Sequence, residues 1–546
     1  MIAPDKIPAL YNKHGSLKNI ARKLDVSFGA VERAYHKAVE QGLMVHVAGG
    51  RKPHTHTKLV GTKQRAKALK TIRKRHKAYI LTCAQNNTLA HEATWENLKA
   101  LAEYTGAEIY VSTFLYSKRG LGQRNDKAQL TGAPRDVDDI WFDPAITPYI
   151  NNRRIEIAKG LVYCGELNIL PTAQRPLSGL EVYTGRASMI VPHVKQELES
   201  VATLGGSGAK LNYSTGTITQ RNYIQRKEGF KGEFYHTYGG LFVEVDDDGH
   251  WWVRQLNADS EGTIHDLDLK VEHGKITEGH RVEAITFGDV HVANIDEEVR
   301  AATWDEGGMV DVLRPRFQFV HDVLDMYSRS HHTKKDPYKV FKRFCQEQDN
   351  VQAEVEQAAD FLAEIKRDDC QTVVINSNHD RHLGRWLAEN DGRFDPVNAF
   401  FWSWLNAQTI DYQFTHDGNE PDHFKLAIER MRPNFEADNN VYFLPSDHSF
   451  VLCPKFGGGI EAGMHGDLGP NGARGSIGYF AKFGRRSNVG HSHTTGIRGG
   501  AFQTGTNSKL RLEYVHGPSS HSHSDIITHE NGKRQIVTLF NGKWRA

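Results

Sequence analysis

Apolar residues recur at helical spacing in two short stretches near the N-terminus. Residues 16–25, SLKNIARKLD, predict a helix that Ser16 could cap, with an apolar face made of Leu17, Ile20, Ala21 and Leu24. After a short VSF turn, residues 29–42 predict a second helix whose inward positions are Val31, Ala34, Tyr35, Ala38 and Val39. Two such helices are typical of a helix-turn-helix, whose second helix enters the major groove of DNA. An ordinary helical hairpin used for packing or assembly is the alternative.

The middle of the chain mixes strand and helix patterns. AYILTCAQNN (78–87) predicts a strand that ends in a polar loop, and the stretch 95–114 predicts a helix, a glycine stop and a second strand. Four further segments are strand-like and are bounded by turn signals: 179–185, 187–194, 239–256 and 265–276. The third of these contains Asp-Asp-Gly near its centre and predicts a β-hairpin. We therefore expect an α/β domain with hairpins over residues 78–275.

The last part of the chain repeats one pattern five times, an apolar strand followed by Asp, His or Asn. The five strand ends carry Asp289-x-His291, Asp322, Asn378-His379-Asp380, His465 and His491-x-His493. In an extended chain residues i and i+2 point the same way, so Asp289 and His291 could approach one ion together. Loops at strand ends often carry chemistry, although Asn and Asp are also common in plain turns.

The composition is that of a globular protein with two to four domains. The chain has 546 residues, of which 39% are hydrophobic and 25% are charged. It contains no apolar run of the roughly 18 residues that a membrane span needs, and its first residues lack the apolar stretch of a signal peptide. The cysteines are five and scattered, which favours reduced thiols. We therefore expect a cytoplasmic protein that does not contact membranes.

Positive charge is concentrated in the first 77 residues. Residues 1–50 carry seven Lys or Arg against four Asp or Glu, and residues 51–77 carry eleven against none. This head has a net charge of +14, which leaves −12 for the remainder of a chain whose total is +2. A basic head on an acidic body predicts contact with a polyanion, and the helix-turn-helix pattern makes DNA the expected partner. We expect a helix-turn-helix domain at 1–50 and a basic linker at 51–77.

The residues at the five strand ends are suited to metal binding. Carboxylate and amide oxygens alternate with imidazoles, and no thiol takes part. Such a mixture suits Mn²⁺, Fe or Zn²⁺. Other His-x-His pairs occur at His54/His56 and at His521/His523. We prefer His491/His493 as ligands because Gly490 precedes them, and we expect His521 and His523 to lie near the site, possible contacts for a substrate.

In order, these motifs resemble those of the calcineurin-like metallophosphoesterase superfamily over residues 289–493. The resemblance implies that one ion is held by Asp289, His291, Asp322 and His493, and a second by Asp322, Asn378, His465 and His491. It further implies that Asp322 bridges the two ions, that His379 protonates the leaving oxygen and that Asp380 orients His379. The implied cofactors are two divalent ions, with Mn²⁺ preferred over Mg²⁺, Fe or Zn²⁺.

Two positions depart from the motifs of that superfamily. His321 stands before Asp322, and Ser377 stands before Asn378, where glycine is usual. Neither departure removes a ligand, but both put the shape of the loops in doubt. Asp325 keeps the spacing of the second motif, although we read it as an acid on a helix surface. Three residues that follow the third motif could hold a phosphate backbone or simply form a helix surface: Arg381, His382 and Arg385.

The resemblance also implies the fold. We expect an α+β (α/β) protein in which residues 280–546 form a two-sheet β-sandwich flanked by helices, with an insertion at 381–448 that could cap the site. Before it stand the α/β domain and the small helical head. The hairpin-rich middle also suggests assembly into a homo-oligomer.

The function that this resemblance implies is hydrolysis of a phosphoester. Because the head favours nucleic acid, we expect a metal-dependent DNase of the nuclease (SbcD-like) branch. A weaker resemblance, over most of the chain, is to metallophosphoesterases of tailed bacterial viruses, among them an early nuclease that degrades host DNA. One alternative is a DNA-binding regulatory protein whose phosphatase module acts on a small phosphoester or phosphoprotein. Another is an assembly protein with a vestigial site.

Overall fold

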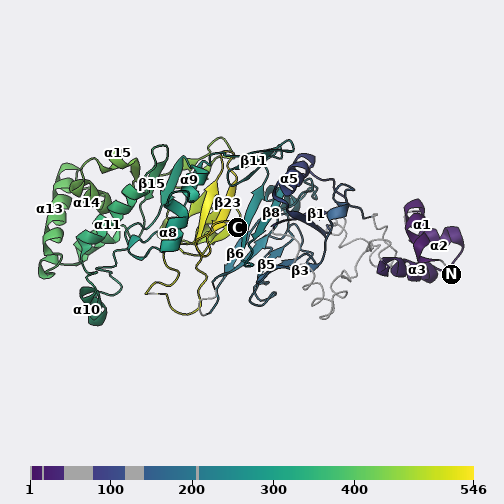
Figure 1. Ribbon diagram of the computed structural model, residues 1–546, viewed down its shortest axis with the longest axis horizontal. Helices are drawn as coiled ribbons and strands as arrows, with labels where there is room; N and C mark the ends of the chain where they lie inside the picture. Colours follow the sequence, from purple (N-terminus) through teal and green to yellow (C-terminus); the bar gives the residue numbers. More distant parts are fainter. Residues whose placement is uncertain (1–2, 15–16, 42–77, 117–139, 205–207, 514) are drawn as a thin grey trace.

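The N-terminal segment forms three helices around a small apolar core of its own. The computed structural model describes residues 3–14, 17–41, 78–116, 140–204, 208–513 and 515–546 (Figure 1). The predicted helix pair is confirmed as α2 (Leu17–Leu24) and α3 (Phe28–Glu40), and α1 (Ile7–His14) packs against both. Leu24 is 41% exposed, so its expected inward position is wrong. Ser16 and the basic linker 51–77 lie outside the described residues.

A six-stranded mixed sheet carries the first three polar strand ends. Its order is β16-β15-β14-β13-β22-β23, and the first four strands are parallel. The last two are antiparallel, so a C-terminal hairpin extends the sheet beside β13. The bounds are β13 (Ala284–Thr286), β14 (Phe317–Val320), β15 (Gln371–Ile375), β16 (Val441–Leu444), β22 (Ser524–Thr528) and β23 (Arg534–Thr538).

A ten-stranded sheet carries the other two polar strand ends. It runs in the order β17 (Val451–Leu452), β18 (Ile460–Glu461), β19 (Arg486–Val489), β21 (Ala501–Gln503), β20 (Gly496–Arg498), β6 (Leu198–Val201), β7 (Lys210–Ser214), β5 (Ser188–Val191), β4 (Leu161–Cys164) and β3 (Arg154–Ala158). The pairing of β20 with β6 joins the C-terminal third of the chain to the middle segment. This sheet therefore crosses the expected boundary near residue 275, and the division into domains stays a prediction.

The six-stranded sheet is buried on both faces because its apolar residues alternate in direction. One face, with Phe319 and Val373, packs on Leu452 and Ile460 of the ten-stranded sheet. The other face, which includes Ile285, Val320, Val374 and Val537, packs on helices. These helices are α8 (Glu297–Trp304), α9 (Met309–Leu313), α11 (Val351–Glu364), α12 (His382–Glu389), α13 (Ala399–Thr415), α14 (His423–Met431) and α15 (Phe435–Asn439). The result is one helical layer on two stacked sheets.

The middle segment forms two smaller sheets beside the large ones. The predicted strand–helix–strand order is confirmed as β1 (Ala78–Gln85), α5 (Glu92–Thr105) and β2 (Glu108–Phe114), and Gly106 ends the helix with φ +69°. The predicted hairpin is β8 (Gly239–Val245) with β9 (Trp251–Asn257), in a sheet of order β2-β1-β8-β9. Residues 265–276 form most of a three-stranded sheet of β10 (Ile264–Asp266), β11 (Leu269–Glu272) and β12 (Lys275–Thr277).

One expected strand is absent from this region. Residues 181–186 form turns, and Val182 is 84% exposed. Among the described residues no strand pairs with segment 179–185, so its alternating apolar residues do not form part of a sheet. The remaining α-helices of the described part of the chain are α7 (Lys227–Phe234), α10 (Pro337–Cys345) and α16 (Ile477–Phe480). In Figure 1 α13, α14 and α15 lie on the left, whereas α5 and β1 lie right of the centre.

The helices and the cysteines bear on membrane spans and on disulfides. Among the described residues, no helix combines the length and the apolar character needed to cross a bilayer. All five cysteines are free, and four of them are buried.

Candidate metal centre

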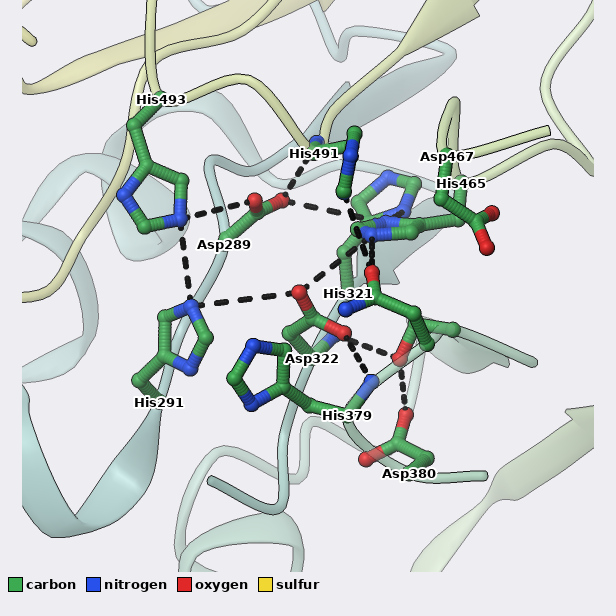
Figure 2. A network of polar contacts seen from close by, with 12 residues as sticks. Asp289, His291, His321, Asp322, His379, Asp380, His465, Asp467, His491 and His493 are labelled. Carbon is green, nitrogen blue, oxygen red and sulfur yellow. Dashed lines mark hydrogen bonds and ion pairs between the residues drawn. The ribbon is translucent and has the colours of Figure 1, made fainter. Parts of the chain in front are cut away.

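The five polar strand ends converge on one buried cluster (Figure 2). Asp289, Asp322 and Asn378 follow β13, β14 and β15, whose carboxyl ends lie side by side because the strands are parallel and adjacent. Ligands commonly bind at such ends of a parallel sheet. The three histidines from the other sheet follow β18 and β19, which are also adjacent and parallel. The stacking of the two sheets therefore brings all seven predicted ligands together.

The first set of possible ligands consists of Asp289, His291 and His493, all buried. The Nε2 atom of His493 lies 3.1 Å from Oδ2 of Asp289 and 3.2 Å from Nε2 of His291. Three donor atoms this close together can surround one small cation.

The second set consists of Asp322, His465 and His491, and Asn378 completes it. The side-chain oxygen of Asn378 lies 2.7 Å from Nε2 of His465 and 3.0 Å from Nδ1 of His491. The Nε2 atom of His465 is also 3.3 Å from Oδ2 of Asp322.

Asp322 lies between the two sets. The same Oδ2 atom that approaches His465 lies 3.9 Å from Nε2 of His291, in the first set. Its other oxygen, Oδ1, accepts a hydrogen bond from the backbone N–H of His379 at 3.0 Å. This carboxylate is therefore held where it could contact two ions at once, as the sequence motifs implied.

The charges of the cluster fit a bound cation. Burial alone would raise the pKa of Asp322, but His465 and His379 hold it well below its ordinary value. Burial would lower the pKa of His465, yet Asp322 and Asp289 raise it to about 9. The buried Oδ2 of Asp289 has Nε2 of His493 as its recorded partner, at 3.1 Å. Two buried carboxylates thus favour positive charge between them, which metal ions could supply in place of protons.

The backbone at the cluster adopts a costly conformation. Four of the seven candidate ligands have left-handed φ angles: His291 (48°), Asp322 (44°), His491 (71°) and His493 (54°). Non-glycine residues in this region cost about 1–3 kcal/mol each and cluster at functional sites. Gly490 completes the geometry, since a Cβ there would lie 2.6 Å from Oδ1 of Asp289. The glycine before His491 is thus explained by close packing on a ligand.

His379 lies beside the cluster and contacts Asp325. Its Nδ1 atom lies 2.9 Å from the backbone carbonyl oxygen of Asp325 and 3.4 Å from the carboxylate. Burial opposes the charged ring, but Asp322 and Asp325 raise the pKa of His379 to about 10. Asp325 also lies 3.1 Å from Nδ1 of His291. Its assignment to a helix surface is therefore wrong: it is a buried residue in the loop after β14.

The recorded contacts of Asp380 are with loop residues on either side of the cluster. Asp380 accepts hydrogen bonds from Ser377 Oγ and from the backbone N–H of Leu324, so it ties the loop after β15 to the loop after β14. Ser377 Oγ in turn accepts from the backbone N–H of Asp322 at 3.0 Å. Among the described residues, the carboxylate recorded next to the ring of His379 is that of Asp325, and no contact of this ring with Asp380 is recorded. Burial raises the pKa of Asp380 to about 7.

Ser377 and His321, which stand where the motifs usually have glycine, both contact the cluster. Ser377 supplies the link to Asp322 that a glycine could not. His321 is buried, and its Nδ1 lies 3.4 Å from Nδ1 of His465. Its ring is therefore packed against the ligand His465 in the interior of the protein.

The five suggested substrate contacts fall into two groups. The ring of His382 lies 4.9 Å from that of His379, and the ring of His521 lies 5.0 Å from that of His493, so both are close to the cluster. The other three already have partners in the protein. Arg381 pairs with Asp467, Arg385 pairs with Glu389 at 2.6 Å, and His523 donates to the carbonyl of Ser508 at 3.0 Å.

Two further groups of possible ligands were not predicted. One consists of His291, Asp325 and His379, beside the first set, and the other lies far from the cluster in sequence. Asp246, Asp248 and His250 lie together in the turn of the β8–β9 hairpin. Asp246 Oδ1 accepts hydrogen bonds from the backbone N–H groups of Asp248 and His250, which is the ordinary geometry of an aspartate in a turn.

Comparison with known proteins gives one relative that extends over most of the chain. No family model matches the sequence, and no solved structure matches it. The chain is 36% identical to Protein A1 of Escherichia phage T5 over 485 residues, which cover 87% of this chain and 84% of that protein. Identity at this level over this length indicates common descent and a shared fold. The chain therefore belongs to the family of phage proteins that includes Protein A1 of Escherichia phage T5.

Proposed function

We propose that this protein is a metal-dependent DNase of the calcineurin-like metallophosphoesterase type. The observation that carries the proposal is the position of Asp322 between two sets of His, Asp and Asn ligands. Two ions bound there, Mn²⁺ by preference, would polarise the phosphate oxygens and lower the pKa of a bound water. The calcineurin-like fold is part of this proposal, supported by the two stacked sheets and the order of the five motifs.

His379 is the proposed general acid. Its Nδ1 atom is occupied by Asp325, which fixes the plane of the ring. Among the described residues Nε2 forms no recorded hydrogen bond, so it can give a proton to the leaving oxygen. Asp325 acts as a positioning residue because it contacts both His379 and His291. Replacing such partners of ligands commonly costs about 10–100-fold in metal affinity or activity.

DNA is the proposed substrate and partner. The support is the net charge of +14 in the first 77 residues and the helix pair in that segment, together with the family of a phage protein. Phosphate contacts supply most of the affinity of non-specific DNA binding. A phage enzyme of this kind would act in the host cytoplasm and degrade host DNA.

We also propose that the protein assembles into a homo-oligomer. The support is α13, which leaves Phe400, Ile410 and Phe414 at 57–89% exposure. Exposed large apolar side chains that lie close together often mark a protein–protein interface. Light scattering of the purified protein would test this, and a mass equal to one chain at micromolar concentration would reject it.

The experiment that tests the activity is digestion of supercoiled plasmid and of linear duplex in Mn²⁺, in Mg²⁺ and in EDTA. We expect loss of both DNAs in metal and neither in EDTA, and loss of the closed circle would show internal cutting. The His379→Ala variant serves as the control for a contaminating nuclease. Intact DNA in every lane, with turnover of a chromogenic phosphomonoester, would favour the regulatory phosphatase instead.

A further inference from the structure

A basic groove of about 880 Å³ lies on the ten-stranded sheet side of the molecule, and none of its lining residues belongs to the metal centre. Its walls come from α7, from the segment around α16 and from the end of β20. Six of the lining residues are Lys or Arg, and none is Asp or Glu. An anion is therefore the ligand that the groove would attract.

Four of these six cations form no recorded ion pair among the described residues, although the charge of Arg498 also acts on the carboxyl of Glu197. Lys195 pairs with Glu197, and Arg175 lies 3.6 Å from Glu199. The four without a recorded ion pair are Lys227, Lys231, Lys482 and Arg498. Two of them stand on α7, and the other two come from the α16 and β20 side. Their charge is thus available to a ligand on both walls of the groove.

Aromatic side chains are interleaved with the lysines on α7. Lys227, Phe230, Lys231 and Phe234 follow the spacing i, i+3, i+4 and i+7, which places them on one face of a helix. Phe230 is 54% exposed and Phe234 is 80% exposed. Exposed aromatic rings between cations are what single-stranded nucleic acid uses, since bases stack on the rings while phosphates meet the charges. A duplex keeps its bases stacked inside and could not use the rings.

The rest of α7 is built to hold that face toward the groove. Gly229 and Gly232 are buried on the opposite side, where a Cβ at Gly229 would lie 1.8 Å from the carbonyl oxygen of Ile224. A Cβ at Gly232 would lie 3.2 Å from the ring of Tyr223. Each glycine costs about 1 kcal/mol in a helix, so close packing is the physical reason for both. That packing fixes which way the Lys and Phe residues point.

The groove lies within reach of the metal centre along the chain. Arg498 ends β20, and His493 precedes that strand by a few residues. Five residues of extended chain span at most about 18 Å. A strand with a rise of ~3.4 Å per nucleotide would cover that distance in about five nucleotides. One single strand could therefore occupy the groove and the metal centre together.

We propose that this groove binds a single-stranded segment of nucleic acid, with Phe230 and Phe234 stacking on bases and the four cations contacting phosphates. This inference rests on the proposed function, because it assigns the groove to the same substrate. It adds that the enzyme prefers strands with an unpaired segment.

The test is photocrosslinking of the full-length protein to a twelve-nucleotide oligo(dT) that carries 4-thiothymidine, in EDTA so that no hydrolysis intervenes. We expect adducts on residues 227–235. The Phe230→Ala/Phe234→Ala variant should lose at least nine-tenths of these adducts and bind oligo(dT) about tenfold more weakly. The matched control is Phe341→Ala/Phe344→Ala on α10, where two exposed aromatic residues also lie among lysines, away from the groove. Adducts on other segments alone, or equal losses in both variants, would overturn the proposal.

A second measurement tests the charges without reliance on the rings. Each phosphate contact on a single strand contributes about −0.7 to the slope of log affinity against log salt. Lys227→Ala/Lys231→Ala should therefore make the slope for oligo(dT) shallower by about 1.4, and an unchanged slope would reject the proposal. Because both measurements are made in EDTA, they stand apart from the activity. Wild-type cleavage of plasmid with no groove adducts rejects the groove alone, whereas groove adducts without cleavage reject the DNase alone.

Discussion

The Nδ1 atom of His379 lies 2.9 Å from the backbone carbonyl oxygen of Asp325, while Asp380, its neighbour in the chain, is directed toward Ser377 and Leu324. Two acids that flank the same histidine in space and in sequence thus have separate tasks. Asp325 orients the proposed general acid, and Asp380 holds two loops together. This separation can be measured.

Asp325→Asn and Asp380→Asn should therefore differ in their effect on turnover. Asp325→Asn should lower the turnover of DNA by about 10–100-fold, since it weakens a contact with His379 and with the ligand His291. It should also lower the melting temperature, because the buried carboxylate pairs with His291 and accepts a hydrogen bond from Asn294. Asp380→Asn should lower the melting temperature by a similar amount, since two buried hydrogen bonds to its carboxylate are disturbed, at about 1–3 kcal/mol, but it should lower turnover less. Turnover and thermal melting of both variants would check this, and a larger loss of turnover in Asp380→Asn would return the orienting role to Asp380.

His379→Ala should keep the metal ions and lose turnover. A positioned proton donor contributes about 10²–10⁴-fold, and His379 itself belongs to neither ligand set that shares Asp322. Mn²⁺ content by mass spectrometry and the initial rate of plasmid cleavage are the two measurements. Full rate on DNA would show that the proposed role is wrong.

The position of Asp322 predicts a pattern of metal loss. Asp322→Ala should lose both ions, whereas His493→Ala and Asn378→Ala should each weaken one, because these two residues lie in different sets. Wild-type protein should also melt at a higher temperature in Mn²⁺ than in EDTA. An ion at a hundred times its Kd contributes about 2.7 kcal/mol to stability. Titration calorimetry would count the metal sites of each variant. If all three variants bound one ion with the same affinity, Asp322 would not be shared by two ions.

Gly490→Ala should damage the metal centre while the rest of the fold stays intact. The added Cβ would lie 2.6 Å from Oδ1 of Asp289 and would push this ligand from its place. Overpacking of this kind costs about 1–3 kcal/mol, which corresponds to a loss of roughly tenfold or more in Mn²⁺ affinity. Gly484→Ala is the control, since a Cβ there meets no atom within 4 Å. Equal Mn²⁺ affinity in the two variants would show that Gly490 is replaceable.

The local pattern of the sequence predicted the strand ends because each signal there is short and complete. An apolar run followed by Asp, His or Asn is visible within ten residues, and the structure brings those residues together. The role of Asp325 could not be read in this way. Its contacts depend on how the loops after β14 and β15 meet, and chain adjacency pointed to Asp380 instead.

Long-range pairing also lay beyond the local pattern. The bond between β20 and β6 joins Gly496 to Glu199, and nothing near either residue specifies that partner. The turns at 181–186 show the opposite error, where alternation suggested a strand but no neighbour was there to pair with it. Patterning thus predicts which segments can be strands, and tertiary contacts decide which of them are.

The position of β13 has a consequence for when the metal centre can form during synthesis. This strand presents Asp289, yet it is hydrogen-bonded to β22, which ends at Thr528, near the C-terminus. A ribosome that adds ~5–20 residues per second needs roughly 12–48 s to pass from the one to the other. During that interval the nascent chain contains Asp289 but lacks the strand that pairs with β13 on that side. The metal centre can therefore reach its final structure only after almost the whole chain has been made.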